Sequence, residues 1–82
     1  MKLKSVNDEL KQLVRKPPED VTAKTHIHIL TREIEKSDSF DNEAERKLVE
    51  RLKWISRMTV DKEIFRTLEK MVTQIKKDGI TV

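Results

Sequence analysis

The sequence predicts an all-α fold, a compact bundle of four to five helices. Its 82 residues include one glycine and two prolines, and 40% of them are charged. Sheets and loops use more glycine, proline and β-branched residues, so this composition favours helices. The length suits a single domain with a modest core. That core should be aliphatic, because the only aromatic residues are Phe40, Trp54 and Phe65.

The first predicted helix extends from about Lys2 to Arg15. Its apolar residues follow the spacing of one helical face, at Leu3, Val6, Leu10, Leu13 and Val14. Pro17-Pro18 should end this helix, because the residue before a proline disfavours the helical conformation. Ser5 and Asn7 could also cap a later start, which would leave the first residues frayed.

The second predicted helix begins near Pro18 and extends to Lys36. Pro18 suits the first turn of a helix, and the acidic Glu19 and Asp20 suit its positive end. Apolar residues then recur at spacings of four, three and four, at Ala23, Ile27, Leu30 and Ile34. The alternation over His26–Ile29 also permits a strand. We favour the helix, because Ile34 extends the helical period and no turn interrupts it.

A polar loop over Ser37–Asn42 should precede the third helix, since it contains several good N-cap residues. Asp41 could begin a short helix that either merges with the third helix or breaks near Arg46. This choice decides between four and five helices. The apolar residues of the third helix are Ala44, Leu48, Val49, Leu52 and Ile55.

The fourth helix should begin after Thr59 or Val60, and Asp61 suits an N-cap at its start. Its apolar stripe comprises Ile64, Phe65, Leu68, Met71, Val72 and Ile75. Lys76 and Lys77 suit the negative end of the helix, and Gly79 suits a left-handed stop. We expect Ile80–Val82 to form a tail.

The turn at Arg57–Val60 carries two apolar residues where polar ones are usual. Met58 and Val60 could either fold inward and plug the end of the bundle or line a groove for a partner. Trp54 lies off the main apolar stripe of its helix. It could pack at the core edge or serve as a partly exposed anchor for a ligand.

The sequence shows few signs of catalytic or metal-binding chemistry. The absence of cysteine excludes disulfides and cysteine-based zinc sites. His26 and His28 are two residues apart, whereas metal-binding pairs on helices need a spacing of three or four. A single glycine cannot form a glycine-rich phosphate loop. We therefore expect a non-enzymatic protein without metal or cofactor.

Two basic clusters could meet an acidic partner, although each could equally be a solvated helix face. They comprise Lys2, Lys4, Lys11, Arg15 and Lys16 in the first, and Arg46, Lys47, Arg51, Lys53 and Arg57 in the second. The net charge of +3 is compatible with acidic partners and only weakly favours nucleic acid. No apolar run approaches the ~20 residues needed to span a membrane.

Three segments, KLKSVNDELKQLV, LKWISRMTV and EIFRTLEKMVTQIKK, resemble a known family. They are similar to the integrase-binding domain of lens epithelium-derived growth factor and of the hepatoma-derived growth factor-related proteins. These domains belong with the helical N-terminal domains of transcription elongation factor IIS type. The resemblance covers nearly the whole chain, with about two residues missing near Ser37–Asn42. It implies a right-handed helical bundle from a nuclear, chromatin-associated protein.

The resemblance also implies a pocket between two interhelical loops, here Arg15–Pro18 and Arg57–Val60. Such a pocket binds short disordered motifs in which acidic residues flank a Phe-x-Gly-Phe-like anchor. Met58 stands where the family has an aromatic residue, and Val60 matches its valine. The basic residues that match the family's basic positions are Lys11, Arg15, Lys53 and Arg57.

The chain departs from the family in its first loop and at Trp54, which replaces a basic residue. Lys16 and Pro17 occupy the places of an Ile-Asp pair whose aspartate accepts hydrogen bonds from the ligand backbone. Neither side chain can accept such bonds. Asp20 or Glu19 could substitute as the acceptor if the loop is remodelled.

We therefore predict that residues 1–82 form one helical protein-interaction domain excised from a larger protein. It would act as a nuclear, monomeric adaptor for acidic, hydrophobic disordered peptides, tethered to chromatin by flanking domains. Phenylalanine side chains would enter a gap lined by Val14, Val21, Met58 and Val60. The predicted partner-binding residues are Lys11, Val14, Arg15, Lys16, Pro17, Val21, Lys53, Trp54, Arg57, Met58 and Val60. Two alternatives are direct contact with nucleic acid and a homodimer seam formed by Trp54, Met58 and Val60.

Overall fold

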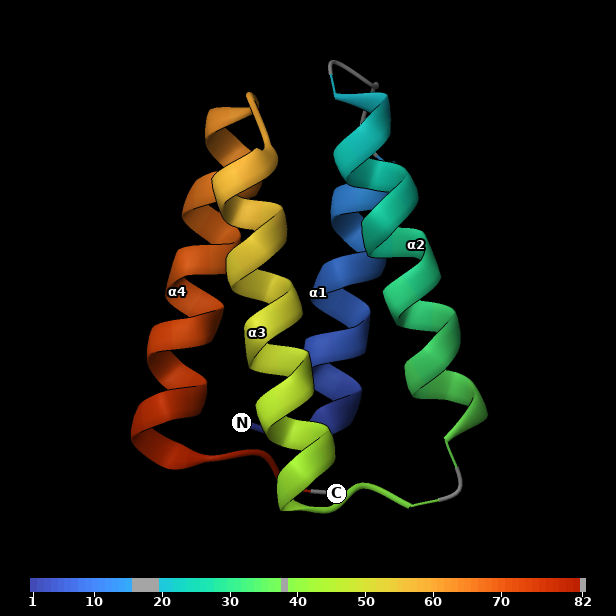
Figure 1. Cartoon of the computed structure of the whole chain (residues 1–82), viewed down its shortest axis with the longest axis vertical. Helices are drawn as coiled ribbons and strands as arrows, with labels where there is room; N and C mark the ends of the chain where they lie inside the picture. Colours follow the sequence, from blue (N-terminus) through green and yellow to red (C-terminus); the bar gives the residue numbers. More distant parts are fainter. Residues whose placement is uncertain (16–19, 38, 82) are drawn as a thin grey trace.

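Four antiparallel helices form the described part of the protein (Figure 1). The computed structural model describes residues 1–15, 20–37 and 39–81. The helices are α1 (Leu3–Arg15), α2 (Val21–Lys36), α3 (Asn42–Met58) and α4 (Lys62–Asp78). The prediction of an all-α bundle is thus confirmed. None of these helices combines the length and the apolar character needed to cross a membrane.

Aspartate side chains cap three of the helices. Asp20 precedes α2, Asp41 precedes α3 and Asp61 precedes α4, and each accepts a backbone N–H bond from the first turn that follows. Because α3 continues unbroken past Arg46, the short helix considered from the sequence is merged into it. The predicted Asp61 cap is confirmed, as is the stop at Gly79, which has a φ of 74°.

The second helix begins later than the sequence suggested. Asp20 has a non-helical backbone conformation, and its side chain accepts a hydrogen bond from the Ala23 N–H. The helix therefore starts at Val21 and not near Pro18. Pro18 and Glu19 lie outside the described residues, as do Lys16 and Pro17 of the predicted site.

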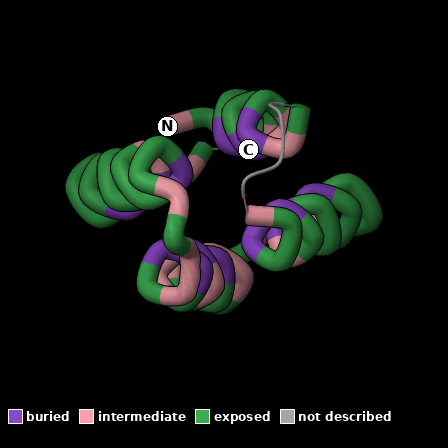
Figure 2. Tube along the Cα trace, turned by 90° about the horizontal axis from the view of Figure 1, so that it is seen from above, coloured by how far each residue is buried: buried purple, intermediate pink, exposed green. Residues whose placement is uncertain are grey.

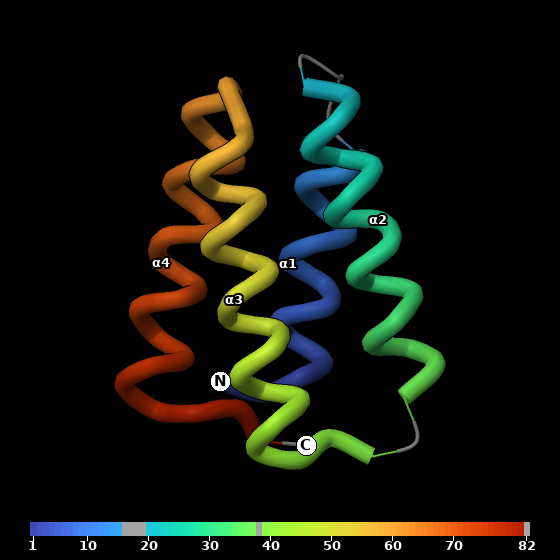
Figure 3. The backbone as a smooth tube through the Cα atoms, viewed as in Figure 1, coloured from blue at the N-terminus to red at the C-terminus, as the bar shows by residue number. Residues whose placement is uncertain are grey.

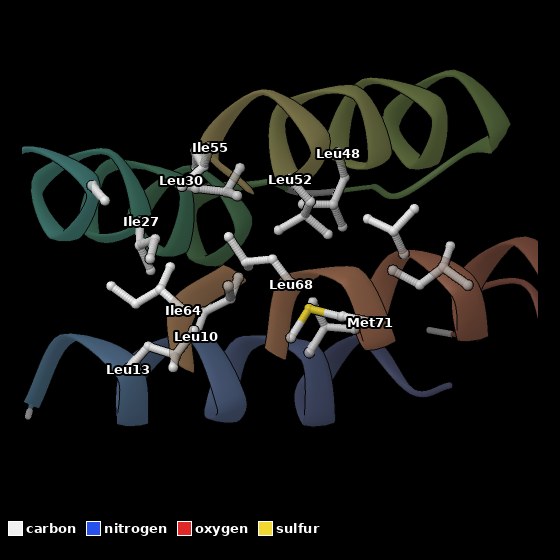
Figure 4. Packing of buried hydrophobic residues seen from close by; sticks show 14 residues of the cluster. Leu10, Leu13, Ile27, Leu30, Leu48, Leu52, Ile55, Ile64, Leu68 and Met71 are labelled. Carbon is white, nitrogen blue, oxygen red and sulfur yellow. The ribbon is translucent and has the colours of Figure 1, made fainter. Parts of the chain in front are cut away.

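The buried core draws on all four helices and is aliphatic, as predicted. Figure 2 shows the buried residues on the sides of the helices that face the centre of the bundle, and Figure 4 shows their side chains converging there. Its fourteen apolar members are Val6, Leu10, Leu13, Ala23, Ile27, Leu30, Leu48, Leu52, Ile55, Ile64, Leu68, Met71, Val72 and Ile75. Phe65 was expected on the apolar stripe of α4, but it lies at the edge of that stripe and is 45% exposed.

The four helices form two hairpins. The pairs α1–α2 and α3–α4 pack most extensively, whereas fewer residues of α2 and α3 lie close to each other. An ion pair joins Lys11 to Glu35 across the first hairpin, and the Ser56 hydroxyl donates to Glu69 at 3.2 Å across the second. Arg51 and Glu33, 2.5 Å apart, connect the hairpins along the α2–α3 seam. Each hairpin thus has its own links, and the seam between them is the looser contact.

The two ends of the described chain are tied together at the base of the bundle (Figure 1). The Leu3 N–H donates to the Thr81 carbonyl at 2.8 Å, and the Thr81 N–H donates to the Met1 carbonyl at 2.9 Å. The Ile80 N–H donates to Oε1 of Glu45 at 2.5 Å. The first residues are therefore held by hydrogen bonds and do not fray, which was one possibility from the sequence. The expected tail after Gly79 is also hydrogen-bonded, as far as Thr81.

Replacing Leu52 with alanine should test how far the bundle depends on its shared core. Leu52 is completely buried, so Leu52→Ala should lower the free energy of unfolding by about 2–5 kcal/mol. Urea denaturation followed by circular dichroism would measure the change. The matched control is Ile29→Ala, because Ile29 is 42% exposed and should contribute under about 1 kcal/mol. Equal losses in the two variants would contradict the assignment of Leu52 to the core.

Candidate functional site

Asp20 links the start of α2 to the turn between α3 and α4. Its Oδ1 accepts the Ala23 N–H at 3.0 Å. Its Oδ2 accepts both the Thr59 hydroxyl at 2.7 Å and the Val60 N–H at 3.0 Å. The Thr59 oxygen in turn accepts the Asp61 N–H at 3.1 Å. These bonds place the beginning of α2 beside the turn at Thr59 and Val60.

The same bonds lower the pKa of Asp20 below its ordinary value. The largest cause is the Ala23 N–H, followed by the Thr59 hydroxyl and the Val60 N–H, all of which stabilise the charged carboxylate. A carboxylate has about four acceptor positions, and three of those of Asp20 are already used within the protein. Asp20 is therefore mainly a structural group, with little capacity left for the ligand-accepting role considered from the sequence.

Exposed apolar side chains gather at this end of the bundle. We call Val21, Trp54, Met58 and Val60 the loop-end patch. Val60 is 84% exposed, Val21 63% and Trp54 53%. Met58 ends α3 and is half-buried against the core. The sequence left open whether Met58 and Val60 fold inward or line a groove. Met58 partly folds inward, whereas Val60 faces solvent.

Trp54 is held by an aromatic contact across the α2–α3 seam. Its ring and that of His26 have centroids 4.8 Å apart and meet edge to face at 89°. Trp54 thus packs on α2 through this contact and still exposes about half of its surface. Sequence reasoning did not predict the role of His26. One signal was present, because His26 precedes Glu33 by seven residues and so shares the face that meets α3.

The predicted basic residues lie on different sides of the molecule. Arg57 is exposed in the last turn of α3, close in sequence to the loop-end patch. Lys11, Val14 and Arg15 line a separate hollow of about 310 Å³ between α1 and α2. Their other neighbours in this hollow are His28, Thr31, Arg32 and Glu35. The structure therefore brings together Lys11, Val14 and Arg15, but on the α1–α2 flank.

Lys53 of α3 faces α4, within the second hairpin. The nearby Lys76 ammonium, through hydrogen bonding and charge repulsion, lowers the pKa of Lys53. Both lysines line a shallow depression between α3 and α4, together with Glu45, Arg46 and Glu50. Lys53 thus lies toward α4, whereas its neighbour Trp54 lies toward α2.

The described residues contain no group of three or more histidine, cysteine or acidic side chains placed to hold a metal ion. No known protein family, curated protein or solved structure matches this chain. We therefore infer its function from the residues and their geometry.

The importance of the Asp20 bonds can be tested by Asp20→Asn. Asparagine keeps one oxygen for the Ala23 N–H, but its amide nitrogen cannot accept from Thr59 and Val60. We expect a loss of about 1–2 kcal/mol in the free energy of unfolding. Asp41→Asn is the matched control, because Asp41 caps α3 through a local bond to Ala44 and asparagine caps equally well. Equal stability of the two variants in urea denaturation would contradict the proposed linking role.

The lowered pKa of Asp20 also predicts a pH dependence. Its contribution should be fully present above its ordinary pKa of 3.8 and lost as the pH falls through the lower value of the folded state. The difference in stability between the wild type and Asp20→Asn should therefore shrink below about pH 4. Urea titrations from about pH 6 to about pH 2 would measure it. A difference that stays constant over this range would argue against a charged Asp20 at the link.

Proposed function

We propose that this chain is a non-enzymatic adaptor module that binds a short, acidic, phenylalanine-containing disordered segment of a partner protein at the loop-end patch. The observation that carries the proposal is the exposure of Val21, Trp54 and Val60 at one end of the bundle. Several exposed apolar side chains at one end of a small domain favour an interaction surface there. Hydrogen bonds that Asp20 accepts from Thr59 and Val60 hold part of this surface in place.

The chemistry of the patch suits a peptide with an apolar anchor and flanking acids. Aromatic side chains of the peptide would cover Val60 and the exposed part of Trp54. Arg57 and the more distant Arg15 would attract the acidic residues, chiefly raising the association rate. Because the disordered segment must become ordered on binding, we expect affinity on the order of micromolar.

The wider context of this proposal comes from the resemblance to integrase-binding domains. This context is a right-handed bundle, a nuclear location and tethering to chromatin through flanking domains. We also propose that the isolated domain is a monomer. No cofactor is required by this function. The partner would be a nuclear protein with a motif that suits a patch bearing Trp54 and Met58.

A second candidate function is direct contact with nucleic acid on the α1–α2 flank. Lys11, Arg15 and Arg32 line the same hollow there, and Glu35 is the acidic residue among its described lining. Such contacts would respond steeply to salt, because cations bound to phosphates are released on binding. Lys11 is already ion-paired with Glu35, which weakens this alternative.

A chemical-shift titration of the labelled domain with an acidic Phe-x-Gly-Phe peptide tests the proposal. We expect saturable shifts centred on residues 20–22 and 54–60 that largely survive moderate salt. Val60→Ser should weaken binding about tenfold, since it removes most of the apolar surface of one anchor. Ile29→Ser is the matched control, because Ile29 is also an exposed apolar residue but lies outside the patch.

Two results would contradict the peptide-binding proposal. One is an equal effect of Val60→Ser and Ile29→Ser on binding. The other is a set of diffuse shifts along α1 and α2 that salt removes, which would favour the nucleic-acid alternative. A parallel titration with duplex DNA of mixed sequence would then measure the salt dependence directly.

A further inference from the structure

An apolar hollow lies between α2 and α3, toward the end of the bundle away from the loop-end patch. Its volume is about 210 Å³. We call it the α2–α3 hollow. Its apolar lining is formed by Leu30 and Ile34 of α2, Phe40 of the connecting segment, and Ala44 and Leu48 of α3. Glu33, Ser37, Lys47 and Arg51 supply its polar lining.

The hollow exists because α2 and α3 separate toward the segment that connects them (Figure 3). Leu30 and Leu48 are buried and form its floor, whereas Ile34, Phe40 and Ala44 are half-buried. Ala44 is the smallest of these apolar lining side chains. The residues belong to the outer part of the core, so the cavity opens from the core to the surface.

The size and lining of the hollow suit a small aromatic ring. A dry cavity of about 150 Å³ lined by leucine, isoleucine and phenylalanine is large enough to hold benzene. The α2–α3 hollow is larger, at about 210 Å³, and has the same kinds of side chain. It can therefore take a ring and a short substituent, with the substituent directed toward the polar lining.

The charges at the hollow favour an anionic substituent. Among its described lining residues, Arg51 and Lys47 are the cations and Glu33 is the acid. The Arg51 guanidinium donates to Glu33 through Nη1, and a guanidinium has five donors in all. Lys47 lies 3.7 Å from Glu43 and remains largely exposed. Both cations can thus meet a carboxylate, while an amine would face their repulsion.

We propose that the α2–α3 hollow binds a small aromatic carboxylate. The ring lies among Leu30, Ile34 and Phe40, and the carboxylate pairs with Arg51 and Lys47. This site is distinct from the loop-end patch and does not depend on the peptide-binding function. A ligand of this class would also bridge α2 and α3 and so favour the folded state.

Titration of 3-phenylpropionate into the isotope-labelled full chain tests the proposal. We expect saturable amide shifts around Ile34, Ala44 and Leu48, and little change at the loop-end patch. The neutral analogue 3-phenylpropanol should bind about tenfold more weakly, because it lacks the charge that Arg51 and Lys47 meet. Shifts that rise linearly without saturation, or equal binding of the alcohol, would overturn the proposal.

Two variants separate the ring from the carboxylate. Ala44→Leu fills the hollow and should abolish the saturable shifts. Arg51→Gln should weaken binding about tenfold, whereas the matched control Arg46→Gln, on the side of α3 that faces α4, should leave it unchanged. Unchanged circular dichroism would verify the fold of each variant. Undiminished binding by Ala44→Leu, or equal effects of the two arginine substitutions, would refute the assignment.

Discussion

One end of this bundle depends on the hydrogen bonds that the Asp20 carboxylate accepts. It caps α2, and it also holds the Thr59 hydroxyl and the Val60 N–H of the turn between the other two helices. Thr59 is thereby placed to accept the N–H of Asp61, whose own side chain caps α4. One side chain thus fixes the start of α2, the end of α3 and the start of α4 relative to one another. The exposed position of Val60 follows from this arrangement.

Backbone hydrogen bonds between the two ends of the described chain stabilise the opposite end of the bundle. Between the two ends of the bundle, side chains make the contacts across the α2–α3 seam. The backbone bonds of Thr81 with Met1 and Leu3 join the start of the chain to the segment after α4. Between the two ends, α2 and α3 are joined by the contact of Trp54 with His26 and by the ion pair of Arg51 with Glu33. A partly exposed ion pair contributes little stability, so the Arg51–Glu33 pair holds this seam only weakly. The α2–α3 hollow lies there.

The sequence was sufficient to predict the helices, because their apolar residues recur with helical period and their ends carry strong signals. Asp61 and Gly79 are examples of such local signals. Phe65 was predicted on the apolar stripe but is partly exposed, because periodicity does not predict whether a residue at the edge of a stripe is buried. The link from Asp20 to Val60 spans 40 residues, and no spacing rule predicts a hydrogen bond of that range. Lys53 and Trp54 were both placed in the predicted site, although adjacent helix residues are about 100° apart and the two face different helices.

A turn that binds a partner functions best when it is already ordered, because ordering a mobile segment on binding costs free energy. The turn after α3 meets this condition through bonds made during folding. Its Val60 contributes little to the core, since 84% of its surface is exposed. Stability alone therefore gives no reason for an apolar side chain on this rigid turn. An exposed apolar residue whose backbone is fixed by bonds from Val60 and Thr59 to one carboxylate is what a preorganised anchor for a peptide requires, and this agreement is the strongest physical support for the proposed function.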